Sequence, residues 1–308
     1  MHLASNKRSE LLVLHDALRL EARKLYEDGL VPADRGADWR EALWEARKVI
    51  VAVLRASNYL CDVSAALQVS GRHMHVLRHM MAPPTSQDQF ALICPAWSKS
   101  SENSGAPVKG EKADVVAATF VQWSSSRLAP WLRGKRPPSL REISSLMSSV
   151  APLIAKERVA TARRNRLARL QETALMDRLV ATGWTLLSSR LIDKQGAIQP
   201  GQFMHKARFA SGLKGRAEVD VALGLTDKLV LAMECKVTND ETNSVKRIND
   251  VSKKATAWRK HWGNFVQPAA LLEGVIKLSD VERLIEEDVE VFWSHRLDLF
   301  EKWLEQQI

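Results

Sequence analysis

Residues 215–236 read GRAEVDVALGLTDKLVLAMECK, and their pattern predicts the core of the fold in the C-terminal half of the chain. Apolar and polar residues alternate on both sides of residues 226–227, which is typical of two antiparallel strands joined by a turn. With a period of two, Asp220 faces one side of the first strand, and Glu234 and Lys236 share one side of the second. Folding about the turn brings Asp220 close to Glu234. We therefore predict two carboxylates and one ammonium group together on a β-hairpin.

Two carboxylates held this closely raise each other's pKa unless a cation lies between them. Oxygen ligands in small number suit a hydrated Mg²⁺ that completes its octahedron with water and a substrate phosphate. Lys236, one pleat beyond Glu234, adds a positive charge where a water must be polarised. We therefore predict a Mg²⁺ site held by Asp220 and Glu234 together with the backbone carbonyl of Cys235.

The alternative interpretation of the three charges is an ordinary cross-strand ion-pair cluster. Residues 230–237 argue against it, because they form an apolar strand whose two charges lie near its end, whereas a solvated face would carry polar residues throughout. The triplet Glu234-Cys235-Lys236 is also the only acidic-x-Lys triplet in the chain. We favour the catalytic interpretation for these reasons.

The hairpin resembles the core of the PD-(D/E)XK nuclease superfamily, because Asp220 is followed, after thirteen intervening residues, by Glu234-x-Lys236. Val219 stands where that pattern has proline, a variation that the superfamily tolerates. The resemblance implies an αβββαβ core in a mixed sheet flanked by helices. It also implies that Asp220, Glu234 and Lys236 are catalytic.

Three further segments resemble a narrower family, the XamI-like type II restriction endonucleases. They are residues 77–88 (LRHMMAPPTSQD), the pair Gln171-Glu172 and residues 243–248 (NSVKRI). In nucleases of the superfamily a glutamate on the helix before the sheet often supports the metal, which makes Glu172 the candidate. The alternative for Glu172 is a helix salt bridge to Arg169 or Arg178.

Helical periodicity dominates the first part of the chain, and strand patterns dominate the second. Helices are predicted over residues 8–30, 38–57, 113–132 and, from a capping box at Ser139 and Glu142, onward to 182, with a polar loop over 98–112. Strands are predicted over 184–190, 217–225, 228–237, 265–273 and 289–293, with helices over 244–262, 279–287 and 296–307. This order predicts a mixed sheet flanked by helices. We expect a helical region over 1–150, used in DNA recognition or dimerisation, and a nuclease domain over 151–308.

Two basic helices are candidates for DNA binding. The predicted helix 244–262 places lysines opposite its apolar face, with further cations on an adjacent stripe, and the helix before the sheet is rich in arginine. The candidates are Lys246, Arg247, Lys253, Lys254, Lys260, Arg163, Arg164 and Arg166. The alternative for these rows is a solvated face. His73, His75 and His79 we interpret as polar or core positions of a helix rather than as a metal site.

The chain has 308 residues, of which 45 are Lys or Arg and 36 are Asp or Glu, so its formal net charge is +9. This excess favours a polyanionic partner, although a solvated basic surface would also produce it. The three cysteines form no CxxC pair, which fits a reducing cytoplasm. No segment approaches the length of apolar sequence that spans a membrane, so no membrane partner is expected.

The favoured reaction is Mg²⁺-dependent hydrolysis of a phosphodiester of double-stranded DNA at a short specific site. A homodimer is expected, because cutting both strands of a palindrome mirrors a protein twofold. A DNA methyltransferase is the expected genetic partner. Two alternatives stay open: a repair or recombination nuclease of the same superfamily, and an inactive nuclease fold that serves as a DNA-binding regulator.

Overall fold

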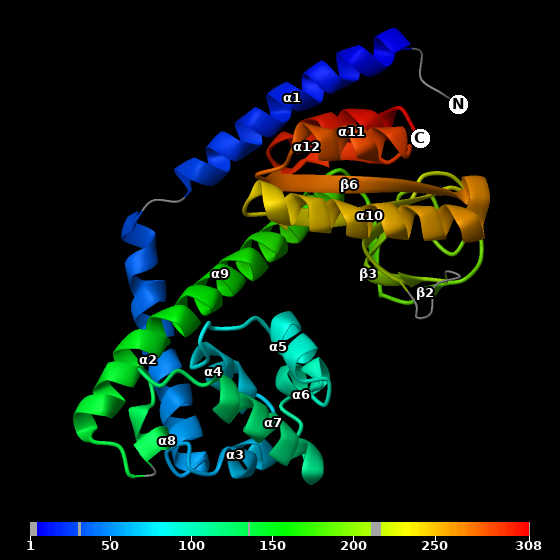
Figure 1. Cartoon of the computed structure of the whole chain (residues 1–308). Helices are drawn as coiled ribbons and strands as arrows, with labels where there is room; N and C mark the ends of the chain where they lie inside the picture. The colour runs from blue at the N-terminus through cyan, green and yellow to red at the C-terminus, as the bar shows by residue number, and fades with distance from the viewer. Residues whose placement is uncertain (1–4, 30–31, 135, 211–216, 308) are drawn as a thin grey trace. The chain divides into compact units, whose positions relative to one another are not determined.

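The computed structural model describes residues 5–29, 32–134, 136–210 and 217–307 (Figure 1). They form two compact units: Pro32–Ala162 is one, and Met1–Val31 with Arg163–Ile308 is the other. The predicted boundary at residue 150 therefore differs from the observed division, in which the first helix belongs with the C-terminal unit. The reason is packing, because Leu18 and Ala22 are buried in the core beside the sheet.

The Pro32–Ala162 unit is helical and has its own apolar core, in which Trp131, Phe90 and Phe120 are among the largest fully buried side chains. Its helices are α2 (Pro32–Ala56), α3 (Val63–Val69), α4 (His73–His79), α5 (Gln87–Ile93), α6 (Lys99–Ser104), α7 (Glu111–Trp123), α8 (Pro130–Gly134) and the first part of α9 (Leu140–Ala181). The capping box at the start of α9 is confirmed, because the Ser139 N–H donates to Glu142 Oε2 at 2.8 Å and the Glu142 N–H donates to Ser139 Oγ at 3.3 Å.

Two predictions for this unit are wrong in detail. The loop expected over residues 98–112 contains helix α6. The helix expected over 113–132 ends at Trp123, because Ser124 forms a β-bridge with Met81 and the Ser125 N–H donates to Met80 O at 2.9 Å. The chain thus exchanges helical hydrogen bonds for contacts with a distant segment.

The second unit contains a seven-stranded mixed sheet in the order β1-β3-β4-β5-β6-β7, with β2 paired to β3. Its strands are β1 (Thr185–Leu187), β2 (Leu191–Ile192), β3 (Gln202–Phe209), β4 (Ala217–Gly224), β5 (Val230–Thr238), β6 (Val266–Gly274) and β7 (Glu290–Trp293). Strands β3, β4 and β5 are antiparallel, whereas β5, β6 and β7 are parallel. The predicted fold class is confirmed, and the αβββαβ order corresponds to α9, β3, β4, β5, α10 and β6.

The hairpin of β4 and β5 has the predicted pairing. Val221 pairs with Met233 and Gly224 with Val230. The turn is wider than two residues, because the backbone N–H of Leu225 donates to Leu229 O. Continuing the register by one residue places Asp220 opposite Glu234.

Strand β3 was missed by the sequence analysis, which placed the first core strand at residues 184–190. Only residues Thr185–Leu187 of that segment form a strand at the sheet edge. Strand β3 reads QFMHKARF, and its buried residues do not alternate strictly with exposed ones. The irregularity centres on Lys206, whose φ is +53°. A left-handed residue breaks the period-two pattern on which strand prediction depends.

Helices cover both faces of the sheet. The end of α9 and α12 (Leu297–Glu305) pack on one face through Leu175, Leu179 and Phe300. On the other face lie α1 (Ser5–Asp28), α10 (Glu241–Trp262) and α11 (Leu278–Glu286). Figure 1 shows α10 running along β6 and α1 beside α11. In the described part of the chain, no helix is long and apolar enough to cross a membrane.

Candidate active site

Three carboxylates from separate elements face the same end of the hairpin. Glu172 comes from α9, Asp220 from β4 and Glu234 from β5. Lysine ammonium groups lie between them. Lys206 Nζ donates to Glu172 Oε1 at 2.7 Å and to Asp220 Oδ1, and Lys236 Nζ lies 2.6 Å from Glu234 Oε2 and 3.5 Å from Asp220 Oδ2. The predicted trio is therefore brought together, as part of a larger charge cluster.

Asp220 is buried, with 11% of its side chain exposed. Burial alone would raise the pKa of its carboxyl group, but the positive charges of Lys236 and Lys206 and a hydrogen bond from the Cys235 N–H hold that pKa below its ordinary value. Asp220 is consequently ionised at neutral pH. The Cys235 N–H donates to Asp220 Oδ2 at 2.8 Å and so fixes the orientation of this carboxylate.

Glu234 is fully buried, and burial raises the pKa of its carboxyl group, with the charges of Lys236 and Lys254 acting in the opposite direction. Lys254 Nζ lies 2.8 Å from each Glu234 oxygen and donates to Glu218 O at 2.7 Å. Lys254 was predicted to contact DNA. In the structure its ammonium group contacts the Glu234 carboxylate, and its contact with DNA stays a prediction.

Glu172 lies against β3. His205 Nε2 and Glu172 Oε2 are 2.7 Å apart, and Lys206 holds the other carboxylate oxygen. The alternative partner Arg178 pairs with Glu301 at 2.7 Å. Neighbouring Gln171 anchors α9, because its amide donates to Leu271 O at 3.0 Å and to Ser294 Oγ at 2.7 Å. The packing of α9 thus directs Glu172 into the charge cluster rather than along the helix surface.

His205 and Lys206 are members of the cluster that the sequence analysis missed. The signal that could have identified them is a histidine and a lysine interrupting an apolar stretch, at a spacing that places Lys206 opposite Asp220 once β3 pairs with β4. That pairing joins His205 to Val221 and Ala207 to Val219. It could be recognised only with the strand itself.

The donor set fits a hard cation. Glu172, Asp220 and Glu234 offer carboxylate oxygens, and the Lys206 ammonium group already makes, with Glu172 and Asp220, the contacts that a cation would make. The thiol of Cys235 is an unsuitable ligand, because burial raises its pKa well above the ordinary value. Only its backbone carbonyl remains a candidate.

The basic residues predicted to bind DNA have different environments. Helix α10 buries Ile248, Val251, Ala255 and Trp258, and the lysines opposite are exposed, as the pattern predicted: they are Lys246, Lys253 and Lys260. Arg247, Arg163 and Arg164 are half-buried, and Arg166 is exposed. The Arg163 guanidinium stacks 4.5 Å above the Tyr26 ring of α1. DNA contact by these residues stays a prediction.

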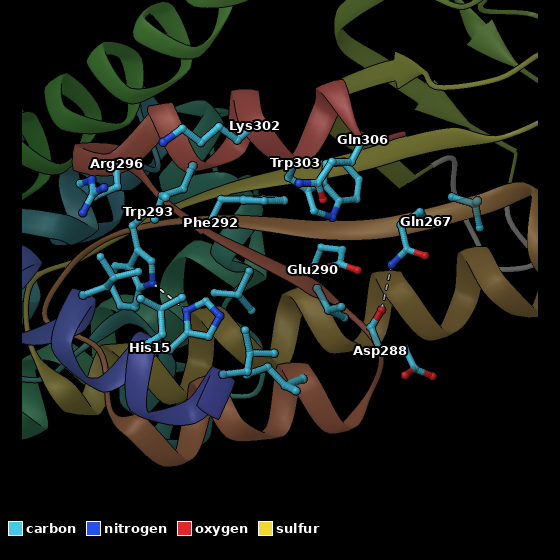
Figure 2. A pocket seen from close by; sticks show the side chains of 18 of the residues that line it. His15, Gln267, Asp288, Glu290, Phe292, Trp293, Arg296, Lys302, Trp303 and Gln306 are labelled. Atoms are coloured by element: carbon cyan, nitrogen blue, oxygen red, sulfur yellow. Dashed lines mark hydrogen bonds between the residues drawn. The ribbon is translucent and has the colours of Figure 1, made fainter. Parts of the chain in front are cut away.

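A cavity of this unit lies away from the charge cluster (Figure 2). It has a volume of about 880 Å³ and is lined by residues of α1, β7 and α12, and its lining includes no member of the charge cluster. In Figure 2 the Trp293 indole faces His15, and its N–H donates to His15 Nδ1 at 3.1 Å. The chemistry of the hairpin is therefore separate from this cavity.

A mixed sheet with the αβββαβ order, carrying an acidic-x-Lys triplet on its third core strand, defines the class of restriction-endonuclease-like proteins. The family model described as XamI restriction endonuclease matches residues 58–293, and the chain belongs to that family. The type II restriction enzyme XamI of Xanthomonas campestris pv. amaranthicola is 33% identical over 195 residues, which are 61% of this chain and 66% of that enzyme. The match thus spans slightly less than two thirds of that relative.

Among solved structures, protein VC1899 from Vibrio cholerae is matched over 88% of this chain and 57% of its own, at 9% identity and a TM-score of 0.30. A likeness of that size carries no argument about fold or function.

Proposed function

We propose that this protein is a Mg²⁺-dependent type II restriction endonuclease that hydrolyses phosphodiester bonds of double-stranded DNA at a short specific site. The observation that carries the proposal is the charge cluster on β4 and β5, in a chain of the XamI family. Asp220 and Glu234 are connected there through Lys236. An ion-pair network that served only the fold would gain little from three buried or half-buried carboxylates at one strand end.

Mg²⁺ would be held by Asp220 and Glu234 with the Cys235 carbonyl, and Glu172 would support it. When bound, the ion offsets charge on the phosphate in the transition state. Lys236 lies against both carboxylates. Its ammonium group would orient the attacking water there or, as the free amine after losing its own proton, would deprotonate that water. His205 and Lys206 orient Glu172. The Cys235 N–H keeps Asp220 facing the cluster.

A digest tests the proposal directly. Purified protein, mixed plasmid DNA and Mg²⁺ should yield discrete fragments whose sequenced ends share one short motif. Cleavage confined to branched or damaged DNA would indicate a repair or recombination nuclease instead. Binding in a mobility-shift assay with no Mg²⁺-dependent cleavage would indicate a regulator.

Variants of the hairpin test the roles of its residues. Lys236→Ala should abolish cleavage while leaving specific binding in Ca²⁺ largely intact, because affinity comes mainly from the basic helices. Asp220→Ala and Glu234→Gln should each abolish cleavage even when Mg²⁺ is raised to roughly tens of millimolar. The reason is that few protein ligands hold the ion, so the loss of one leaves it without a fixed position. Rescue of both variants by a modest increase in Mg²⁺ would show that neither carboxylate is a direct ligand.

We further propose that the protein acts as a homodimer and that its genetic partner is a DNA methyltransferase. A twofold dimer presents two hairpins to a palindromic duplex. Sedimentation of the protein with and without a cognate duplex tests the dimer, and a monomer in both conditions would contradict it.

A further inference from the structure

One group of side chains in the described part of the chain has the geometry of a metal site, and it lies outside the charge cluster. His75 and His79 lie four residues apart on α4, and Glu157 comes from α9. Their ligand atoms all lie within 4.8 Å of one another. All three residues belong to the Pro32–Ala162 unit. From the sequence the histidines were interpreted as polar or core positions of a helix, and Glu157, more than 70 residues further along the chain, was not among the candidates.

Each histidine faces a different oxygen of the same carboxylate. His75 Nε2 lies 3.0 Å from Glu157 Oε2, and His79 Nε2 lies 3.2 Å from Glu157 Oε1. Ligands about 2.1 Å from a tetrahedral ion are separated by about 3.4 Å, so these spacings are close to those of a filled site. Histidines at positions i and i+4 of a helix are a recurrent metal-binding arrangement.

The hydrogen bond on the other side of the His79 ring provides a second observation. His79 Nδ1 lies 2.6 Å from the backbone carbonyl of His75. A carbonyl oxygen can only accept, so Nδ1 carries the proton, and Nε2 of the neutral ring points its lone pair at a carboxylate oxygen. Only a proton or a metal cation between Nε2 and Glu157 makes that contact favourable. An Nδ1–H to a backbone carbonyl is also the usual outer contact of a metal-bound histidine.

The site is accessible to an ion from solvent. The His79 side chain is 6% exposed, His75 26% and Glu157 49%, so the open side lies at the carboxylate. His75 also lines a cavity of about 540 Å³. The nearby Arg78 guanidinium forms an ion pair with Glu102 at 2.9 Å and donates to Thr85 O at 2.8 Å. Its positive charge is therefore compensated by Glu102.

We propose that His75, His79 and Glu157 bind a first-row transition-metal dication such as Zn²⁺, with water completing the coordination. Two imidazoles and one carboxylate select such an ion over Mg²⁺, which prefers oxygen. Val76 follows His75 where a zinc peptidase would carry its glutamate base, so the role is structural. The ion would join α4 to α9 and stabilise the helical unit.

The test is metal binding by the full-length, metal-stripped protein in millimolar Mg²⁺. Equilibrium dialysis with Zn²⁺, and the visible spectrum with Co²⁺, should show that the wild type binds one equivalent of metal at this site. In Glu157→Gln and in His75→Asn the affinity for that equivalent should fall by at least about tenfold. Glu157 and His75 are chosen because neither is fully buried, and circular dichroism checks that both variants fold. Zn²⁺ should also raise the unfolding temperature of the wild type and not of Glu157→Gln.

Three control variants separate this site from others. His73→Gln changes a histidine on the same helix that bonds to Ala66 O instead. Cys61→Ser removes the exposed thiol, and Asp220→Ala disables the charge cluster. All three should retain the equivalent that Glu157→Gln loses. Equal Zn²⁺ binding by wild type and Glu157→Gln, or no binding by the wild type at micromolar Zn²⁺, would overturn the proposal.

Discussion

Lys206 has a backbone φ of +53° while its ammonium group connects Glu172 and Asp220. A non-glycine residue in the left-handed region costs about 1–2 kcal/mol, and such strain is concentrated at functional sites. The pKa of Lys206 is held above its ordinary value: burial opposes the charge, but the two carboxylates outweigh burial. At the scale of single residues, the ammonium group of Lys206 therefore lies between Glu172 and Asp220, two carboxylates that we propose hold or support Mg²⁺.

Replacing Lys206 by Met should increase the affinity of the free protein for Ca²⁺. The substitution removes a competing cation and leaves Glu172 and Asp220 less neutralised, so we expect about tenfold tighter binding, equivalent to ~1.4 kcal/mol. Isothermal titration with Ca²⁺ in the absence of DNA measures it. Lys194→Met, which changes an exposed lysine, is the matched control. Weaker Ca²⁺ binding by Lys206→Met would show that the ammonium group orders the carboxylates instead.

At the scale of elements, α10 divides its lysines between two environments. Lys254 turns inward to Glu234, whereas Lys246, Lys253 and Lys260 remain exposed on the face away from the apolar core. One helix thus contributes both to the charge cluster and to a basic surface. The angular separation follows from 3.6 residues per turn.

If the exposed row touches backbone phosphates, replacing Lys246, Lys253 and Lys260 together by Gln should weaken specific and non-specific DNA binding alike. The plot of log affinity against log salt should flatten by about one unit of slope for each phosphate that is no longer neutralised. Site preference should survive, because phosphate contacts position the protein without reading bases. A salt titration of binding in Ca²⁺ measures the slope. The same change at Lys194, Lys228 and Lys302, exposed lysines outside α10, is the charge-matched control, and equal slopes in the two triple variants would mean that the row is a solvated face.

Helix α1 should give the protein a pH-dependent stability through His15. Burial lowers the pKa of His15 from 6.5 to about 4, and its Nδ1 accepts from the Trp293 N–H. The unfolded chain therefore binds a proton between pH 6.5 and pH 4 that the folded chain does not, so stability falls as the pH falls through this window. His15→Gln keeps an acceptor for Trp293 but cannot titrate.

Urea unfolding at about pH 7.5 and about pH 5 checks the role of His15. Between these two pH values the free energy of unfolding of the wild type should fall by about 2 kcal/mol more than that of His15→Gln. The whole shift of the His15 pKa corresponds to about 3 kcal/mol. An equal loss in both proteins would assign the pH dependence to other groups.

At the scale of the whole molecule, the two compact units have separate apolar cores. The Pro32–Ala162 unit lies in sequence between α1 and the rest of the sheet unit. The sheet unit is therefore built from two segments of the chain, one before and one after the helical unit.

Core variants should loosen one unit at a time. Phe120→Ala in the helical core and Phe300→Ala beneath the sheet each remove a fully buried ring, at a cost of about 3–5 kcal/mol. Hydrogen exchange followed by mass spectrometry should show reduced protection mainly in the unit that carries the substitution. Ca²⁺ binding should survive in Phe120→Ala. An equal drop in protection of both units from either variant would mean that they unfold as one.

Local patterns in the sequence were sufficient to predict the fold class, the hairpin, and the convergence of Asp220, Glu234 and Lys236. These features depend on short-range periodicity, since alternation along a strand determines which residues share a face. The capping box of α9 and the apolar face of α10 are local in the same sense. Each can be read from residues only a few positions apart.

Tertiary contacts determine three further features: Lys206 and His205 join the cluster, Lys254 turns inward, and Glu157 meets His75 and His79. The contacts of Lys254 and Glu157 join segments 20 or more residues apart, as in the bond from Lys254 to Glu234. The positions of His205 and Lys206 depend on β3, in which the left-handed Lys206 interrupts the alternation of buried and exposed residues. Long side chains add to the difficulty, because a lysine can reach either solvent or a buried carboxylate from one helical position. Packing of the distant partner makes that choice, and no local pattern encodes it.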